Sequence, residues 1–133
     1  MADKTKPFGV SYLLDMYGCR PGAADDLELN YRFLEQLVDV IGMTKQCNPI
    51  VFHGPTARGV ELYPDKAGVS AWIPLIESGI QIHTIEPKRF ISLDIYTCGE
   101  IDTAAAREFA RKTFGFERCE ERFLERGTEY NAE

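Results

Sequence analysis

The sequence predicts an α+β protein built on a mainly antiparallel sheet, with two helices on one face of that sheet. Apolar residues recur with helical spacing in only two segments. The other apolar segments alternate with polar residues or form short runs rich in β-branched and aromatic residues, as strands do. The connections between the central strands are short, which favours antiparallel pairing.

The two helices are expected at residues 25–41 and 102–114. Asp102 is a suitable N-cap for the second helix, and Gly42 and Gly115 are suitable C-terminal stops. The apolar positions of the first helix recur at intervals of three, four and seven residues, at Leu27, Tyr31, Leu34, Leu37, Val38 and Ile41.

Six other segments are expected to be strands, giving the order β-α-β-β-β-β-α-β. Pro74 indicates that its strand lies at an edge or contains a bulge. Residues 125–133 are expected to form a loose polar tail. The predicted strands cover residues 8–18, 49–53, 68–76, 80–84, 90–98 and 116–124.

Composition limits the classes of function. The chain has 133 residues, which is the size of a single domain spanning 1–133. Its formal net charge is −6, so nonspecific binding to nucleic acid or to an anionic membrane is not expected. No stretch approaches the ~18 apolar residues of a membrane span, and no signal peptide precedes the domain, so we expect a cytoplasmic protein.

The four cysteines are widely spaced and contain no CxxC pair, which excludes a zinc ribbon or a thioredoxin-type site. We expect reduced thiols, with Cys19, Cys47 and Cys119 acting as small buried hydrophobic residues. No spacing supports a metal site formed by His53, His83 and Cys98, so no metal is predicted.

One face of the predicted sheet is polar. Alternation along the strands places Ser70, His83 and Cys98 on the face opposite the helices. Any one of these residues alone is typical of an ordinary surface or core position. The segment 77–79, Glu-Ser-Gly, taken alone reads as a simple turn.

Together, these segments resemble a known family. Residues 68–70, 77–78, 82–84 and 94–99 have the residue types and spacing of the prokaryotic S-adenosylmethionine decarboxylase proenzymes. The likeness extends from about residue 8 to residue 123. It implies an αββα-type sandwich formed by a homodimer of processed protomers.

The resemblance also implies self-cleavage between Glu77 and Ser78. The Ser78 hydroxyl would attack the Glu77 carbonyl, and elimination from the resulting ester would leave a pyruvoyl group derived from Ser78 as the cofactor. His83 would be the base, because imidazole titrates near neutral pH. Ser70 would assist processing by hydrogen bonding near the scissile carbonyl, and Gly79 would allow unusual backbone angles there.

In the mature family members a substrate amine forms a Schiff base with the pyruvoyl ketone, which accepts electrons as CO₂ leaves. The resemblance makes Cys98 the proton donor to the resulting carbanion. It also makes Glu77 a substrate-binding residue. The product of such an enzyme is the aminopropyl donor for polyamine synthesis.

The chain departs from the family at two places, and these departures leave the substrate open. Gly79 replaces the usual His after the cleavage serine, and the run 85–87, Ile-Glu-Pro, replaces Trp-Pro-Glu. Glu86 is therefore the candidate for binding the ribose of S-adenosylmethionine, and Tyr63 is the candidate for stacking on adenine. The alternatives are a decarboxylase of arginine or ornithine, and an unprocessed, non-catalytic regulatory paralogue.

Overall fold

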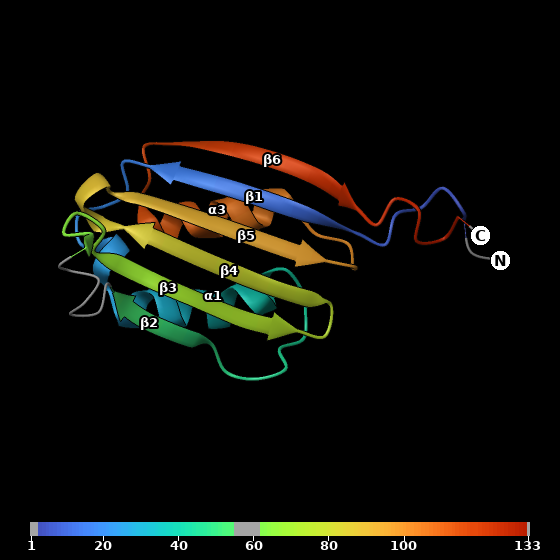
Figure 1. Ribbon diagram of the computed structural model, residues 1–133, viewed down its shortest axis with the longest axis horizontal. Coiled ribbons are helices and arrows are strands. Elements are labelled where there is room, and N and C mark those ends of the chain that lie inside the picture. The colour runs from blue at the N-terminus through green and yellow to red at the C-terminus, as the bar shows by residue number, and fades with distance from the viewer. Residues whose placement is uncertain (1–2, 55–61, 133) are drawn as a thin grey trace.

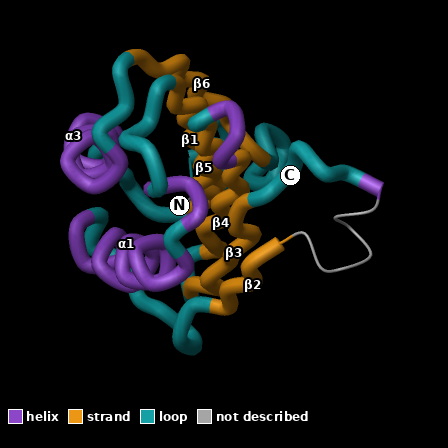
Figure 2. The backbone as a smooth tube through the Cα atoms, turned by 90° about the vertical axis from the view of Figure 1, so that its left-hand side faces the viewer, coloured by secondary structure: helices purple, strands orange, loops and turns teal. Residues whose placement is uncertain are grey.

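The computed structural model describes residues 3–54 and 62–132, which form two layers. One layer is a six-stranded sheet and the other contains two α-helices that lie on the same side of it (Figures 1 and 2). The predicted α+β class and the helices on one face are confirmed. The elements are β1 (Gly9–Tyr17), η1 (Ala23–Asp25), α1 (Leu27–Val40), β2 (Ile50–Gly54), β3 (Gly68–Leu75), β4 (Ser78–Ile85), η2 (Glu86–Lys88), β5 (Phe90–Thr97), α3 (Thr103–Phe114) and β6 (Arg118–Arg126).

All neighbouring strands of the sheet are antiparallel, in the order β2-β3-β4-β5-β1-β6. The prediction that the strand of Pro74 lies at an edge or contains a bulge is wrong, because β3 lies between β2 and β4 and pairs with both in continuous register. Pro74 is tolerated because it lies beyond Trp72, the last β3 residue that pairs with β2. Its carbonyl oxygen instead accepts a hydrogen bond from the Gln46 N–H, at 3.0 Å.

Both helices begin at aspartate caps. The side chain of Asp26 accepts a hydrogen bond from the N–H of Leu29, and that of Asp102 accepts one from the N–H of Ala105. Gly115 ends α3 with a φ of +62°, the left-handed conformation that glycine adopts without strain.

The core lies between the sheet and the helices. The Phe33 ring of α1 lies 4.6 Å from the Phe114 ring of α3, so the two helices share this core. Alternate residues of the central strands face it and are almost fully buried, among them Tyr12, Leu14, Met16, Ile73, Ile80, Ile82, Ile91, Leu93 and Ile95.

Within the described ranges, no helix covers the opposite face of the sheet, called the open face below (Figure 2). Three large apolar side chains from β2 and β3 are exposed on it: Ile50, Phe52 and Trp72. Among the described residues, no helix has the length and apolar content needed to cross a membrane.

The expected loose tail from residue 125 is wrong. Pairing with β1 keeps β6 in register as far as Arg126, opposite Gly9. After the strand, the Tyr130 ring packs edge-on against Phe8, at 4.9 Å between centroids. The C-terminal segment is therefore held against the start of the chain.

Gly68 and Gly54 face each other across β3 and β2 and provide a matched test of packing. A Cβ atom at position 68 would lie 2.0 Å from the carbonyl oxygen of Thr84, whereas one at position 54 would meet no described residue within 4 Å. Gly68→Ala should lower the free energy of unfolding by about 1–3 kcal/mol. Gly54→Ala should change it by less than about 0.5 kcal/mol. Urea denaturation of both variants checks this, and equal effects would contradict it.

Candidate active site

Ser78, the first residue of β4, has a backbone conformation that is rare for a residue with a side chain. Its φ is +143°, whereas Gly79 is not among the residues with positive φ. Such a conformation persists only where the surroundings hold it, at a cost of about 1–3 kcal/mol. The expectation that Gly79 takes up the unusual angles is therefore wrong, and the strain lies at Ser78.

The carbonyl that precedes Ser78 is hydrogen-bonded to the backbone of Cys98. The Glu77 C=O accepts the Cys98 N–H at 2.9 Å, next to the point where Ser78 pairs with Thr97. The Glu77 carboxylate accepts the N–H of Thr44 at 3.0 Å, and this hydrogen bond lowers the pKa of Glu77. Pairing of β4 with β5 thus brings Cys98 against the Glu77–Ser78 bond.

The Cys98 thiol is exposed, in the bend after β5. Cys98 lines a cavity of about 420 Å³ together with Phe8, Ile101 and Phe123. The predicted proton donor is therefore accessible to a small molecule and lies at the same end of the sheet as Ser78.

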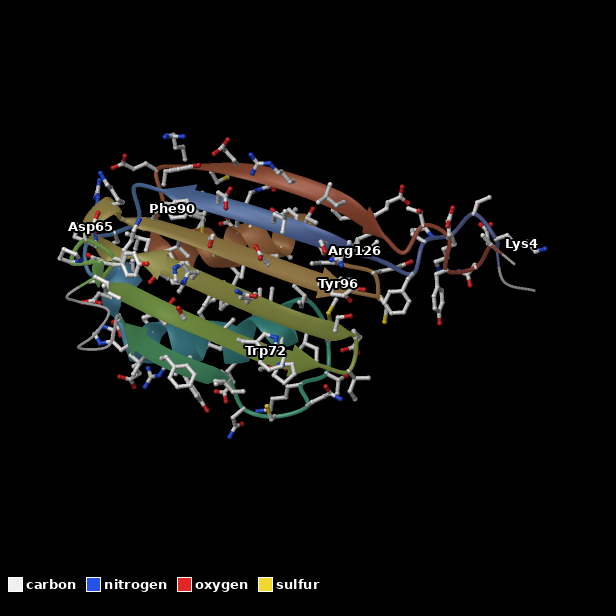
Figure 3. All side chains as sticks on the ribbon, viewed as in Figure 1. Lys4, Asp65, Trp72, Phe90, Tyr96 and Arg126 are labelled. Carbon is white, nitrogen blue, oxygen red and sulfur yellow. The ribbon has the colours of Figure 1, made fainter. Side chains whose placement is uncertain are left out.

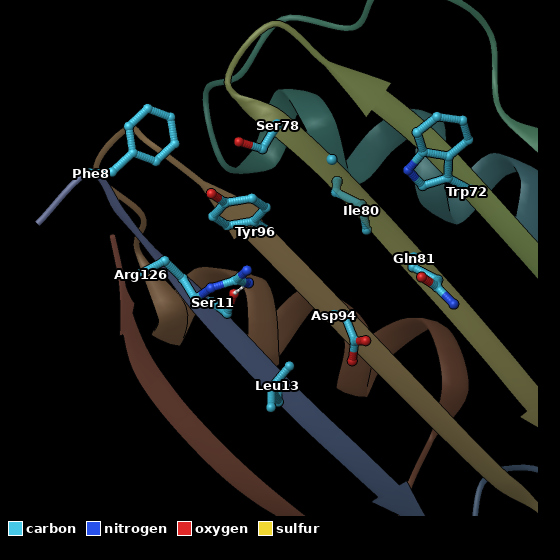
Figure 4. Close-up of a pocket in the computed structure, with 11 residues that line it drawn as sticks. Phe8, Ser11, Leu13, Trp72, Ser78, Ile80, Gln81, Asp94, Tyr96 and Arg126 are labelled. Carbon is cyan, nitrogen blue, oxygen red and sulfur yellow. Dashed lines mark hydrogen bonds between the residues drawn. The ribbon is translucent and has the colours of Figure 1, made fainter. Parts of the chain in front are cut away.

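A second cavity, of about 640 Å³, opens beside Ser78 on the open face of the sheet (Figure 4). Three aromatic residues from different parts of the chain line it, and Asp94 and Arg126 contribute opposite charges. Its lining residues are Phe8, Ser11, Leu13, Trp72, Ser78, Gly79, Ile80, Gln81, Asp94, Tyr96 and Arg126. We call this space the Ser78 cavity.

Gly79 allows Trp72 to lie over the start of β4. A Cβ atom at position 79 would be 3.0 Å from the indole nitrogen of Trp72, closer than side chains normally approach. The Trp72 indole therefore occupies the space that a larger side chain at position 79 would need.

The Arg126 guanidinium lies over the Tyr96 ring, with its central carbon 4.4 Å from the ring centroid. Its Nη1 donates to the Ser11 Oγ at 3.0 Å. These two contacts fix a positive charge inside the Ser78 cavity.

Ser70 and His83 form a second pair of site residues. They are directly opposite in β3 and β4, and the Ser70 Oγ lies 2.9 Å from the His83 Nδ1. Both are exposed on the open face, as the strand alternation predicts. The Ser92 hydroxyl of β5 donates to the His83 carbonyl oxygen at 3.2 Å.

The two pairs are far apart within one chain. His83 follows Ser78 by five residues on the same extended strand. At about 3.3 Å per residue, their Cα atoms are separated by ~16 Å. Ser70 pairs with His83, so the Ser70 hydroxyl does not reach the scissile carbonyl of its own chain. The structure thus brings Ser78 together with Cys98, and Ser70 with His83, but does not join the two pairs.

Glu86 and Tyr63 lie toward the other end of the sheet, the end at which Asp65 and Phe90 are labelled in Figure 3. One oxygen of Glu86 accepts the N–H of Gly22 at 2.6 Å, and the other is buried with no hydrogen-bond partner among the described residues. Tyr63 is exposed. Neither residue lines the Ser78 cavity.

His53 lies on the opposite side of the sheet from His83, because it pairs with the core residue Val69 and bonds Asp25 of η1 at 2.6 Å. The cluster of His53, His83 and Cys98 considered in the sequence is therefore not assembled. Cys19 is buried as predicted and Cys119 half-buried. The prediction for Cys47 is wrong, since it lies exposed between α1 and β2.

The sequence prediction missed most of the residues that line the Ser78 cavity, among them Phe8, Trp72, Tyr96 and Arg126. Strand alternation places Trp72 and Tyr96 on the open face with Ser70 and could have identified them. Arg126 was missed because residues after 124 were assigned to a tail. No local signal in the sequence connects Phe8 with Ser78.

The fold and the site together define a class of protein: a small two-layer α+β protein with a strained serine, a thiol and an imidazole at its exposed sheet. Comparison with known proteins gives the family. A family model described as S-adenosylmethionine decarboxylase matches residues 10–127. The chain belongs to this family.

Individual relatives agree with this assignment. The chain is 33% identical over 124 residues to an S-adenosylmethionine decarboxylase proenzyme from Persephonella marina, which covers 92% of this chain and 85% of the relative. It is 33% identical over 129 residues to one from a Sulfurihydrogenibium species, with coverage of 92% and 84%. A crystal structure of the adenosylmethionine decarboxylase from Aquifex aeolicus superposes with a TM-score of 0.75 at 25% identity, covering 92% of both chains.

Asp94 in the Ser78 cavity allows a test by pH. Burial, and to a lesser degree the negative charge of Asp15, raise the pKa of Asp94 above its ordinary value. A raised aspartate pKa means that stability falls as the pH rises from the unfolded value toward the folded one. Asp94→Asn should therefore raise the free energy of unfolding at pH 7, and the gain should shrink at pH 4. Urea denaturation at both pH values checks this, and an equal gain at both would contradict it.

Proposed function

We propose that this chain is a proenzyme that cleaves itself between Glu77 and Ser78 and then decarboxylates S-adenosylmethionine. The observation that carries the proposal is the strained backbone of Ser78 together with the Cys98 N–H bound to the preceding carbonyl. Membership of the family, supported by proenzyme relatives from two genera, indicates the substrate.

The geometry at the 77–78 bond favours cleavage in two ways. The Cys98 N–H withdraws electron density from the Glu77 carbonyl and stabilises negative charge that develops on its oxygen. The Ser78 Oγ attacks the Glu77 carbonyl carbon, and the peptide C–N bond between residues 77 and 78 breaks. The products of this step are an ester between the Glu77 carbonyl and the Ser78 oxygen, and a free amino group on Ser78 that takes up the proton lost from the hydroxyl. That step releases the strain at Ser78.

Ser78 lies at the wall of a cavity large enough for a nucleoside-sized ligand, so a pyruvoyl group formed there would face bound substrate. Elimination from the ester leaves a carboxylate on Glu77, and hydrolysis with loss of ammonia leaves the pyruvoyl group at residue 78. That group supplies a ketone that takes up the amino group of the substrate and accepts electrons as CO₂ leaves. The Cys98 thiol is the proton donor in this proposal, and Phe8, Trp72 and Tyr96 provide apolar walls.

We also propose that the complete active site forms between two copies of the chain. Removal of the Ser78 Cα proton requires a base, and His83 of the same chain is ~16 Å away. Two open faces packed together would bring the Ser70–His83 pair of one copy to the Ser78 of the other. The same contact would bury the exposed Ile50, Phe52 and Trp72. The result would be the αββα-type homodimer that the family resemblance implies.

We propose that residues 1–133 form a single domain with this activity. Its four cysteines are unpaired, which fits the reducing conditions of the cytoplasm. Glu77 is proposed to contact substrate after cleavage, when it becomes a chain end.

One observation favours a second substrate class. The Glu86 carboxylate is bound to Gly22 and does not line the Ser78 cavity, so it does not offer the ribose contact expected of it. A cationic amino acid such as arginine or ornithine would not need that contact. The named relatives support S-adenosylmethionine over this alternative.

Intact-mass measurement tests cleavage and the ketone together. The wild-type chain should give fragments of 77 and 56 residues, and the 56-residue fragment should gain mass with a carbonyl-trapping reagent. Ser78→Ala should stay a single chain, because the attacking hydroxyl is absent. Release of CO₂ from S-adenosylmethionine, arginine and ornithine, measured in parallel, identifies the substrate.

A single uncleaved wild-type species after long incubation would contradict the proposed function and favour a non-catalytic paralogue. Turnover of arginine or ornithine without turnover of S-adenosylmethionine would contradict the proposed substrate alone.

A further inference from the structure

Arg126 brings a positive charge without a carboxylate partner into the Ser78 cavity. Five other arginines of the described ranges form ion pairs, namely Arg32, Arg89, Arg107, Arg111 and Arg122. On the same strand as Arg126, Arg122 pairs with Asp15 at 3.1 Å. Among the described residues, no carboxylate oxygen lies within 4.0 Å of the Arg126 nitrogens. Its polar contact is the neutral hydroxyl of Ser11.

The charge is placed close to the reacting residue. Tyr96, whose ring lies beneath the guanidinium, pairs with Gly79 on one side and with Ser11 on the other. Neighbouring strands are about 4.8 Å apart, so the guanidinium lies roughly one strand away from the backbone at Ser78 and Gly79. Figure 4 shows Tyr96 between Ser78 and Arg126.

The substrate of the proposed reaction carries a negative charge that Arg126 could bind. A decarboxylase of this class acts on an α-amino acid, whose amino group and carboxylate are attached to the same carbon. When the amino group is held at residue 78, the carboxylate is only a few ångströms from it. Among the described residues that line the cavity, Arg126 is the one with a positive charge, and a guanidinium binds a carboxylate through two parallel hydrogen bonds.

We propose that Arg126 binds the α-carboxylate of the substrate, with Tyr96 and Ser11 holding its guanidinium in place. This inference rests on the proposed function and adds a specificity residue to the same site. Asp94, the carboxyl group that also lines the cavity, forms no ion pair with Arg126.

The role predicts a particular kinetic signature. The carboxylate loses its negative charge as CO₂ forms, so the ion pair is stronger in the bound substrate than in the transition state. Loss of Arg126 should therefore raise KM without a comparable fall in kcat. We expect Arg126→Gln to raise KM for S-adenosylmethionine by about 10- to 100-fold, and Arg126→Lys to raise it less.

Arg118 offers a matched control on the same strand. Its guanidinium lies over the Tyr17 ring, 4.1 Å from the centroid, which reproduces the arginine–aromatic contact at the opposite end of β6. Arg118→Gln should leave KM unchanged, because Arg118 does not line the Ser78 cavity.

Binding provides a readout that does not depend on turnover. Trp72 is the single tryptophan of the chain and lines the Ser78 cavity, so its fluorescence reports occupancy. In a Ser78→Ala background, S-adenosylmethionine and its decarboxylated product are titrated with and without Arg126→Gln. The substitution should weaken binding of S-adenosylmethionine by about 10- to 100-fold and leave binding of the product, which has no carboxylate, unchanged.

Equal weakening of both ligands, or no weakening of S-adenosylmethionine, would overturn the proposal. A dimer that dissociates more readily in Arg126→Gln, measured by sedimentation, with unchanged ligand affinities would instead assign the arginine to the partner copy and also overturn it. Failure of the wild-type chain to cleave would contradict the proposed function alone. The ratio of the two affinities in the Ser78→Ala background would still decide the role of Arg126.

Discussion

Ser78 and His83 lie on one extended strand, and the distance between them constrains every account of how this chain could work. A strand cannot bend enough over five residues to bring the two side chains together while its ladders with β3 and β5 are intact. The same ladders produce two local arrangements that the proposed chemistry would use. One holds the Cys98 N–H on the Glu77 carbonyl, and the other places Ser70 beside His83. The strand pairing that forms the Ser78–Cys98 pair and the Ser70–His83 pair therefore also keeps these two pairs apart within one chain.

The open face of the sheet follows from this arrangement. Core residues alternate with Ser70 along β3, with His83 along β4 and with Tyr96 along β5, so the helices that bury one set leave the other toward the open face. Apolar groups such as Phe52 and Trp72 are exposed beside the polar ones. A face with this mixture is suited to contact with a second copy, because such a contact would bury the apolar groups and complete the site.

Much of the fold could be predicted from the sequence, because it depends on local patterns. Alternation in residues 90–98 identified a strand and the face that meets the helices, and Asp102 and Gly115 identified the ends of α3. The errors came from interactions between distant segments. Pairing of β6 with β1 extends the strand as far as Arg126, opposite Gly9. The pairing of β3 with β2 ends at Trp72, so Pro74 is tolerated in a central strand. The candidate site was predicted as a set of residue types, whereas its division into two pairs required the register of β4.

In the proposed dimer, one active site takes Ser78 from one copy and His83 from the other. Two differently tagged chains, one with Ser78→Ala and one with His83→Ala, can be co-expressed and the mixed dimer isolated by both tags. Intact-mass measurement should show that the His83→Ala chain is cleaved in the mixed dimer, where its partner supplies the imidazole, and is uncleaved or slowly cleaved in its own homodimer. A His83→Ala chain that stays as poorly cleaved in the mixed dimer as in its homodimer would contradict the shared site.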